Sequence, residues 1–153
     1  MKILMVCLGN ICRSPVAEGL MRKIASENNL MVTVDSAGTS GHHNGENPDK
    51  RSQRNALKNG VDISGVISRK FKLNDFEIFD FIYVIDKSNK RNILQMAKDE
   101  TQKNKVKMFL GEEREVPDPW YGGEDGFELV FQMIKNRCEE IVKEIVLQNI
   151  KPH

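Results

Sequence analysis

The stretch Cys7-Leu8-Gly9-Asn10-Ile11-Cys12-Arg13-Ser14-Pro15 decides the fold and the chemistry of this chain. It follows an apolar run over residues 3–6, which predicts a buried strand, and it precedes a segment with helical periodicity. The thiol of Cys7 is therefore expected at the carboxyl end of a strand, facing backbone N–H groups at a helix N-terminus. Such a position binds a tetrahedral dianion, because unpaired amides and the helix dipole both favour negative charge there. It also favours the thiolate form of a cysteine, so the stretch predicts a phosphate-ester hydrolase.

Segments with the pattern of strands alternate with segments of helical periodicity along the whole chain. The expected strands are residues 3–6, 31–34, 81–85 and 106–109. The expected helices are one capped by Ser14 with Pro15 in its first turn, one over 48–58, one from Ser88 or Asn89 to about 97, and one of about twenty residues from 127. Strands that alternate with helices imply βαβ units and a parallel sheet, in which ligands bind at the carboxyl ends of the strands. One domain over residues 1–153 is predicted, because no linker, repeat or low-complexity segment interrupts the pattern.

The composition narrows the class of protein. Hydrophobic residues make up 39% of the 153 residues and charged residues 29%, a balance typical of globular domains. A formal net charge of +1 gives no general attraction to nucleic acid or to anionic lipid, so neither is an expected partner. The apolar runs are far too short to span a membrane, and no signal peptide is visible. With an odd number of cysteines, three, a reduced cytoplasmic protein is expected.

Cys7 and Arg13 are the expected reactive pair. A thiolate is strongly nucleophilic, and the planar guanidinium offers a fork of donors suited to two phosphate oxygens at once. Phosphoryl transfer spreads charge over three equatorial oxygens, so fixed donors supply much of the catalysis. The phosphate-binding residues are expected to be Leu8, Gly9, Asn10, Ile11, Cys12, Arg13 and Ser14. The alternative for Cys7 is a buried strand-end cysteine that acts as a small hydrophobic residue.

Four motifs resemble those of the low-molecular-weight protein tyrosine phosphatase family, in the family's order and spacing. They are the Cys-x5-Arg-Ser loop near the N-terminus, the second-strand motif at 35–39, the third-strand motif at 86–89 and the late Asp-Pro loop at 118–122. The resemblance covers nearly the whole chain. It implies an α/β fold, a doubly wound four-stranded parallel sheet with helices on both faces. It also implies hydrolysis of phosphotyrosine in protein substrates through a cysteinyl-phosphate intermediate, without a metal or an organic cofactor.

The late loop carries the expected general acid and part of the substrate pocket. In the resemblance Asp118 is the acid, because the phenolate leaving group needs a proton and the attacking water later loses one. The alternative is a plain turn aspartate beside proline. Trp120 and Tyr121 are expected to wall a slot that fits a phenyl ring, together with Ile11. The resemblance also places His42 at the pocket rim, where the family often has a large aromatic residue, so His42 or His43 can touch the substrate. The alternative is that both are solvated loop histidines.

Three residues are expected to support the loop. Ser14 can donate to the sulfur of Cys7, which makes the thiolate a better leaving group when the intermediate breaks down. Asn10 tolerates a left-handed backbone, which a loop that folds its amides inward often needs. The resemblance implies that Asn10 bonds to neighbours that include Ser36. Many family members carry a supporting histidine within the segment that corresponds to 62–75, and this chain has none there, so the support of the loop must differ in detail.

The other cysteines and the histidines suggest further roles. A loop curled around a phosphate can bring the sulfurs of Cys7 and Cys12 within disulfide range, which predicts reversible redox control. The alternative for Cys12 is a residue that fills the loop. Cys138 lies on the apolar stripe of the last helix and is expected in the core. A metal site with His42 and His43 is not expected, since Cys7 cannot be both a zinc ligand and a free nucleophile.

Three rival functions remain for the same scaffold. Arsenate reduction needs two further cysteines near the middle of the chain, and none occurs between Cys12 and Cys138. Phosphoarginine hydrolysis is performed by relatives with threonine where this chain has Ile11. A non-catalytic phosphotyrosine-binding module would lack Cys7 or Asp118, and both are present. A phosphotyrosine phosphatase is therefore the predicted function.

Overall fold

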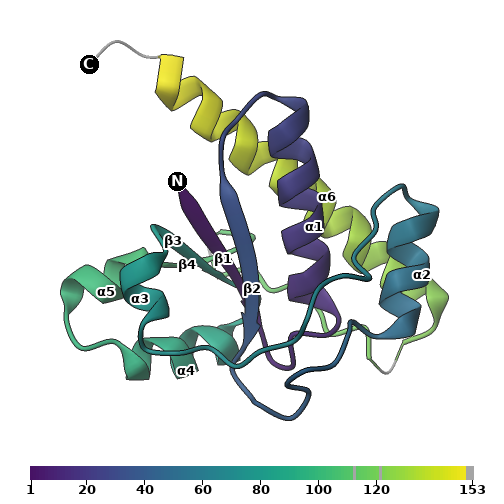
Figure 1. Cartoon of the computed structure of the whole chain (residues 1–153), viewed down its shortest axis with the longest axis horizontal. Coiled ribbons are helices and arrows are strands. Elements are labelled where there is room, and N and C mark those ends of the chain that lie inside the picture. Colours follow the sequence, from purple (N-terminus) through teal and green to yellow (C-terminus); the bar gives the residue numbers. More distant parts are fainter. Residues whose placement is uncertain (112, 121, 151–153) are drawn as a thin grey trace.

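The computed structural model describes residues 1–111, 113–120 and 122–150, and it contains a four-stranded parallel sheet (Figure 1). The strands are β1 (Lys2–Cys7), β2 (Thr33–Gly38), β3 (Phe81–Val84) and β4 (Val106–Met108), in the spatial order β2-β1-β3-β4. The first strand is therefore internal, and it ends between the ends of β2 and β3. Strand order changes direction at β1, and such a switch point is where open α/β sheets bind ligands.

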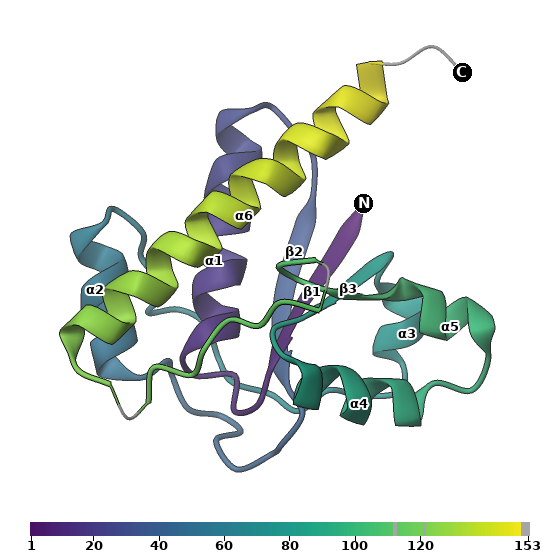
Figure 2. The ribbon, with the colours of Figure 1, turned by 180° about the vertical axis from the view of Figure 1, so that it is seen from behind.

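Helices cover both faces of the sheet, so the predicted doubly wound α/β fold is confirmed (Figures 1 and 2). One face carries α1 (Arg13–Glu27), α2 (Lys50–Lys58) and α6 (Glu124–Ile150). The other carries α3 (Asp75–Ile78), α4 (Lys87–Met96) and α5 (Glu100–Lys105). The short helices α3 and α5 were not predicted, because four and six residues are too few for an apolar stripe to show.

The side chains of β1 alternate between two hydrophobic cores. Ile3, Met5 and Cys7 belong to the core beneath α1 and α6, whereas Leu4 and Val6 belong to the core on the side of α3, α4 and α5. Alternation follows from the two-residue period of a strand, and burial on both faces explains the continuous apolar run that predicts β1. The register places the Cys7 side chain on the side of α1, next to the start of that helix.

Two predicted helix caps are wrong. Helix α1 begins two residues earlier than expected, with Cys12 at the N-cap position and no side-chain cap bond, so Ser14 lies inside the first turn. Helix α4 is capped by Asp86, whose carboxylate accepts from the backbone N–H of Asn89 at 2.8 Å, rather than by Ser88 or Asn89. Asp86 lies two residues after the end of β3, immediately before α4, so its carboxylate is placed to accept from an unpaired N–H group in the first turn of that helix.

The boundaries of two long elements also differ from the prediction. Strand β2 covers Thr33–Gly38, so it begins two residues after the predicted start at 31 and includes the motif at 35–38 with which it was expected to end. Helix α6 has 27 residues, more than the twenty expected. Its apolar stripe, including the fully buried Cys138 that the sequence placed in the core, packs against α1. Across the described part of the chain, no helix combines the length and apolarity needed to cross a membrane.

Candidate active site

The loop between β1 and α1 wraps around the sulfur of Cys7. Asn10 has a φ of 58°, in the left-handed region that asparagine tolerates, and its backbone N–H donates to Cys7 Sγ at 3.3 Å. The hydroxyl oxygen of Ser14 lies 3.0 Å from the same sulfur. The N-terminus of the 15-residue helix α1 begins directly after the loop and adds the positive end of its dipole. The sulfur is thus surrounded by hydrogen-bond donors and positive potential.

The chain after β2 holds the outer side of this loop. Thr39 N donates to Cys7 O at 2.9 Å, and Ser40 N donates to Leu8 O at 3.0 Å, so pairing continues beyond the end of the strand. Gly38 is required for this close approach, because a Cβ there would lie 2.8 Å from Leu8 O. The motif at the end of β2 therefore keeps the loop tightly packed against the sheet.

Arg13 is buried with its guanidinium fixed by two acceptors. Its Nη1 donates to Asp86 Oδ2 at 2.8 Å and to Val116 O at 3.0 Å, and its side chain is only 4% exposed. Its Nη2 lies 3.8 Å from Asp118 Oδ2. Burial by itself lowers the pKa of Arg13, but the charge of Cys7 and the hydrogen bond and charge of Asp86 outweigh it and raise that pKa. A permanent cation therefore lies beside the sulfur.

A cavity of about 250 Å³ opens above the sulfur and brings together residues from three distant segments. Its lining consists of Cys7, Leu8, Gly9, Ile11, Cys12, Arg13, His43, Asp118 and Trp120. The Asp118 side chain is 45% exposed, and its Oδ1 accepts from Trp120 N at 3.0 Å, which fixes the carboxylate in a local turn. A group bound in this cavity can contact the thiol, the guanidinium and the carboxylate together.

The structure corrects the predicted histidine of the pocket rim. His42 is exposed, whereas His43 lines the cavity, because the turn over 42–45 directs the first ring to solvent and the second inward. The His43 ring centroid lies 6.2 Å from that of Trp120, and its Nδ1 lies 2.7 Å from Glu46 Oε2. The ring packs over Gly9, where a Cβ would lie only 3.1 Å from His43 Cδ2. The other predicted wall residue, Tyr121, lies outside the described residues.

Arg51 supports the wall of the cavity, a role that the sequence did not indicate. Its guanidinium carbon lies 5.1 Å from the ring centroid of Trp120 and 4.8 Å from that of Phe127, and Nη1 donates to Trp120 O at 2.9 Å. Asp49 holds the same guanidinium through both of its carboxylate oxygens, at 3.0 and 3.1 Å. Arg51 and Trp120 are 69 positions apart, so no local pattern could have revealed the contact.

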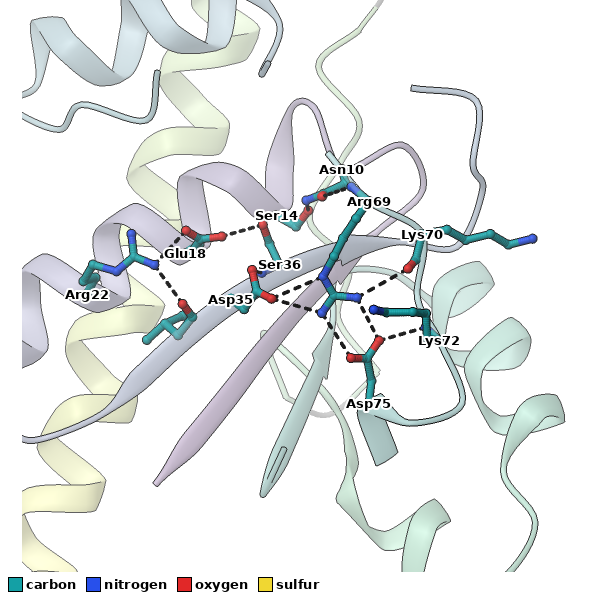
Figure 3. Close-up of polar contacts among 11 residues, drawn as sticks. Asn10, Ser14, Glu18, Arg22, Asp35, Ser36, Arg69, Lys70, Lys72 and Asp75 are labelled. Carbon is teal, nitrogen blue, oxygen red and sulfur yellow. Dashed lines mark hydrogen bonds and ion pairs between the residues drawn. The ribbon is translucent and has the colours of Figure 1, made fainter. Parts of the chain in front are cut away.

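A hydrogen-bond network behind the loop supports it from the segment that lacks the family's histidine (Figure 3). Asn10 Nδ2 donates to Ser14 Oγ at 2.8 Å, and Asn10 Oδ1 accepts from the backbone N–H of Arg69 at 3.0 Å. Ser68 Oγ donates to Gly9 O at 3.0 Å. Two consecutive residues of the histidine-free segment thus hold two consecutive residues of the loop.

Ser36 does not take the place in this network that the resemblance implies. Its hydroxyl donates to Glu18 Oε1 at 2.7 Å, and Glu18 in turn accepts from Arg22 at 2.9 Å (Figure 3). The expected contact with Asn10 is wrong because the Ser36 hydroxyl donates its one hydrogen to Glu18 on α1, while the Asn10 amide bonds to Ser14 and Arg69 instead. Burial raises the pKa of Glu18, against the opposing hydrogen bonds from Ser36 and Arg22.

Cys12 and Cys138 are, like Cys7, buried free thiols. Burial, together with the negative charges of Asp49, Cys7 and Asp118, raises the pKa of Cys12 to about 12. The Cys12 thiol therefore stays protonated at neutral pH and is a weak nucleophile there. Burial also raises the pKa of Cys138, which has no exposed surface.

The fold and the site define the class of protein. A doubly wound parallel sheet presents, at the carboxyl end of its first strand, a cysteine inside a loop whose Asn10 N–H donates to the sulfur. A buried arginine and a half-exposed aspartate line the same cavity. These groups match the needs of phosphoryl transfer, which are a nucleophile, fixed donors for the equatorial oxygens and a group that moves a proton. The class is that of cysteine-dependent phosphatases.

Comparison with known proteins agrees with this class. The family model for low molecular weight phosphotyrosine protein phosphatases matches residues 2–150. The chain is 38% identical to the low molecular weight phosphotyrosine protein phosphatase of Schizosaccharomyces pombe, over 94% of this chain and 96% of the relative. It is 36% identical to that of Homo sapiens, over 92% and 93%. A crystal structure of a protein tyrosine phosphatase from Entamoeba histolytica superimposes with a TM-score of 0.90 at 36% identity, covering 98% of this chain and 99% of that one.

The chain belongs to the low molecular weight phosphotyrosine protein phosphatase family. Its activity is that of a protein-tyrosine-phosphatase, and its substrates are phosphoproteins. The predicted family, fold and enzyme class are thus confirmed by comparisons that cover nearly the whole chain.

Proposed function

We propose that Cys7 is the nucleophile, Arg13 the phosphate clamp and Asp118 the acid and then the base in hydrolysis of phosphotyrosine side chains of cytoplasmic proteins. The observation that carries this assignment is the convergence of the three groups on one cavity of about 250 Å³. Residues 7, 13 and 118 come from the end of β1, the start of α1 and the loop before α6. Free cysteines support a reducing compartment.

In the first step the Cys7 thiolate attacks the phosphorus atom of the substrate. A sulfur–phosphorus bond forms, the bond from phosphorus to the phenolic oxygen breaks, and its electron pair leaves with that oxygen. Asp118 gives its proton to the departing oxygen, so tyrosine leaves neutral. The Arg13 guanidinium and the loop N–H groups bind the non-bridging oxygens, whose charge they match throughout the transfer.

In the second step water hydrolyses the cysteinyl phosphate. The Asp118 carboxylate takes a proton from water as its oxygen bonds to phosphorus, and the sulfur–phosphorus bond breaks with its electron pair returning to sulfur. Asn10 N–H and the Ser14 hydroxyl stabilise the thiolate that re-forms, at the 3.3 and 3.0 Å separations already present. Inorganic phosphate then leaves, and the enzyme returns to its starting state.

The walls of the cavity favour an aryl ester. His43 and Trp120 present two rings whose centroids are 6.2 Å apart, and Ile11 adds an apolar surface. Ring contacts of this kind depend on geometry and stabilise a flat aromatic group more than a short or flexible alkyl group. Ile11 also stands where relatives that hydrolyse phosphoarginine carry threonine, which supports an aryl substrate over a guanidino one.

The test is hydrolysis of p-nitrophenyl phosphate between about pH 4.5 and 8 with a chelator present. Cys7→Ser is expected to abolish turnover, and Asp118→Asn to lower kcat by about 10²–10³-fold. Asp125→Asn, which alters an exposed carboxylate at the start of α6, is the matched control and is expected to leave kcat unchanged. Turnover that persists in Cys7→Ser overturns the assignment. Faster release of phosphate from a phosphoarginine peptide than from a phosphotyrosine peptide overturns the substrate class.

A further inference from the structure

Two arginines anchor two separate polar networks that meet β2 at consecutive residues (Figure 3). Arg22 donates to Glu18 at 2.9 Å and to Val34 O at 2.8 Å, and this network continues to Ser36. Arg69 donates to Asp35, at 3.0 and 3.2 Å, and to the Asp75 carboxylate. The side chains at the adjacent positions 35 and 36 project to opposite faces of the strand, and the two networks meet at the backbone, where Ser36 N donates to Asp35 Oδ1 at 2.8 Å.

We propose that Arg69 is a positioning residue of the catalytic loop, which aims the hydroxyl proton of Ser14 at the sulfur of Cys7. It acts through Asn10, and no part of Arg69 needs to contact the substrate. The inference rests on the proposed roles of Cys7 and Ser14.

Three hydrogen bonds connect Arg69 to Cys7 through Asn10 and Ser14, and we call this series the relay. The direction of each bond follows from the first donor, the backbone N–H of Arg69. The backbone N–H of Arg69 can only donate, so the Asn10 atom 3.0 Å away must be the carbonyl Oδ1. The other end of the amide is then Nδ2, which also can only donate, and it meets Ser14 Oγ at 2.8 Å. One lone pair of Ser14 is thereby occupied, and the Ser14 hydrogen is free to point at Cys7 Sγ, 3.0 Å away.

The Arg69 side chain fixes the backbone that starts this relay. Its guanidinium bridges Asp35 on β2 and Asp75 at the start of α3, with two bonds to each carboxylate between 3.0 and 3.2 Å. The Asp75 side chain is 2% exposed, so its charge depends on Arg69 for compensation. Main-chain bonds of Gly38 with Arg69 O and Phe71 N, both 2.8 Å, hold the same segment against the sheet. The bonds of Arg69 to Asp35 and Asp75, together with these main-chain bonds, therefore fix the position of the Arg69 backbone N–H that donates to Asn10.

Arg69→Ala is expected to lower kcat for p-nitrophenyl phosphate about tenfold, because a displaced Asn10 no longer orients Ser14. Ser14 acts on the breakdown of the intermediate, so a burst of nitrophenol close to one equivalent of enzyme should precede a slow steady state. The inhibition constant of inorganic phosphate should change less than about twofold, since Arg13 still binds the anion. A general loss of structure would raise that constant and remove the burst.

Arg22→Ala is the matched control. Arg22 also pairs with a carboxylate and a carbonyl, and its network ends at Ser36 without reaching Asn10. Its kcat and burst are expected to equal those of the wild type. If Arg69→Ala does not fold, Asp75→Asn and Arg69→Lys remove only part of the bonds between Arg69 and the two carboxylates, and they should show the same fall in kcat in milder form. Urea unfolding of each variant reports whether the fold is retained.

A double-mutant cycle with Asn10→Ala decides whether the relay exists. If Arg69 acts through Asn10, Arg69→Ala adds no further loss of kcat in the Asn10→Ala enzyme. Equal losses in both backgrounds, or a folded Arg69→Ala enzyme with wild-type kcat, overturn the inference. Activity of Cys7→Ser distinguishes failure of the Arg69 role from failure of the proposed active site. An inactive Cys7→Ser enzyme beside a fully active Arg69→Ala enzyme refutes only the role of Arg69, whereas an active Cys7→Ser enzyme refutes the proposed site itself.

Discussion

Arg13 and Asp86 form an ion pair of 2.8 Å across the carboxyl ends of β1 and β3. Asp86 uses its Oδ2 for this pair and its Oδ1 to cap α4 through the N–H of Asn89, also at 2.8 Å. The same carboxylate therefore orients the Arg13 guanidinium and caps the N-terminus of α4. Because the two oxygens serve two purposes, substitutions at this position can separate function from stability.

Asp86→Asn is expected to lower kcat/KM about tenfold while keeping the cap of α4. Asparagine keeps a cap acceptor, but it removes the charge that holds the Arg13 guanidinium. Asp86→Ala removes both, so its free energy of unfolding should fall by about 1 kcal/mol relative to Asp86→Asn. Urea unfolding and steady-state kinetics on the three proteins measure both quantities. An Asp86→Asn enzyme with unchanged kcat/KM would show that Val116 O alone orients Arg13.

His43→Ala is expected to raise the KM for p-nitrophenyl phosphate by about two- to tenfold with little change in kcat. The ring forms one wall of the cavity opposite Trp120, and an aromatic contact contributes about 0.5–1.5 kcal/mol. His42→Ala is the matched control, because that neighbour is exposed and does not line the cavity. A larger increase in KM for His42→Ala than for His43→Ala would contradict the prediction, because it would show that His42 contacts the substrate instead of His43.

The sequence predicted the site where its residues are close together in the chain. Cys7 lies at the end of β1 and Arg13 at the start of α1 because a buried apolar run and a helical stripe are local patterns. The same local pattern wrongly predicted Ser14 as a helix cap, since the helix begins two residues earlier and the Ser14 hydroxyl contacts Cys7 Sγ and Asn10 instead. A shift of two residues moves Ser14 from the cap position into the first turn, beside the sulfur.

Contacts between distant segments could not be predicted from the pattern. Asn10 and Arg69 are 59 positions apart, and their bond depends on how an irregular segment crosses the end of β2. The partner of Ser36 was wrong for the same reason, because Glu18 reaches it from α1. Asp86 offered a usable signal, since a carboxylate that directly follows a strand next to β1 must lie near the loop.

Peroxide is expected to produce a disulfide between Cys7 and Cys12. The Cys12 thiol, with its pKa raised to about 12, stays protonated, so peroxide oxidises Cys7 first and forms a sulfenic acid with release of water. The Cys12 sulfur then displaces hydroxide from that group and closes the bond, and its proton leaves with the hydroxide as water. Mass spectrometry of an acid digest should show the linked peptide, and thiol treatment should restore activity.

Cys12→Ser is the control for this redox prediction. Without a resolving thiol, Cys7 proceeds to sulfinic and sulfonic acids, so activity lost to peroxide should not return with dithiothreitol. The Cys138 thiol is buried in the core and is expected to stay unmodified in both proteins. Equal recovery of activity in wild type and Cys12→Ser, with no linked peptide in the wild type, contradicts the prediction.

The buried carboxyl of Glu18 is expected to make stability depend on pH. Burial raises its pKa above the ordinary value of 4.5, so over the interval between these two values the folded state holds a proton that the unfolded state has lost. The free energy of unfolding therefore falls as pH rises through that interval. Glu18→Gln cannot titrate, and the stability of wild type relative to this variant should decline as the pH rises above the ordinary value of 4.5. Urea unfolding at a series of pH values measures the difference.

Glu27→Gln provides the matched control for Glu18, because Glu27 is an exposed carboxyl near the end of the same helix. Its stability relative to wild type should stay nearly constant over the same pH interval. The sign of the Glu18 effect is the informative result. A wild type that gains stability over Glu18→Gln as pH rises would mean that Ser36 and Arg22 outweigh burial. The Ser36–Glu18–Arg22 network would then be a stabilising ion pair, rather than a buried carboxyl held at a cost in stability.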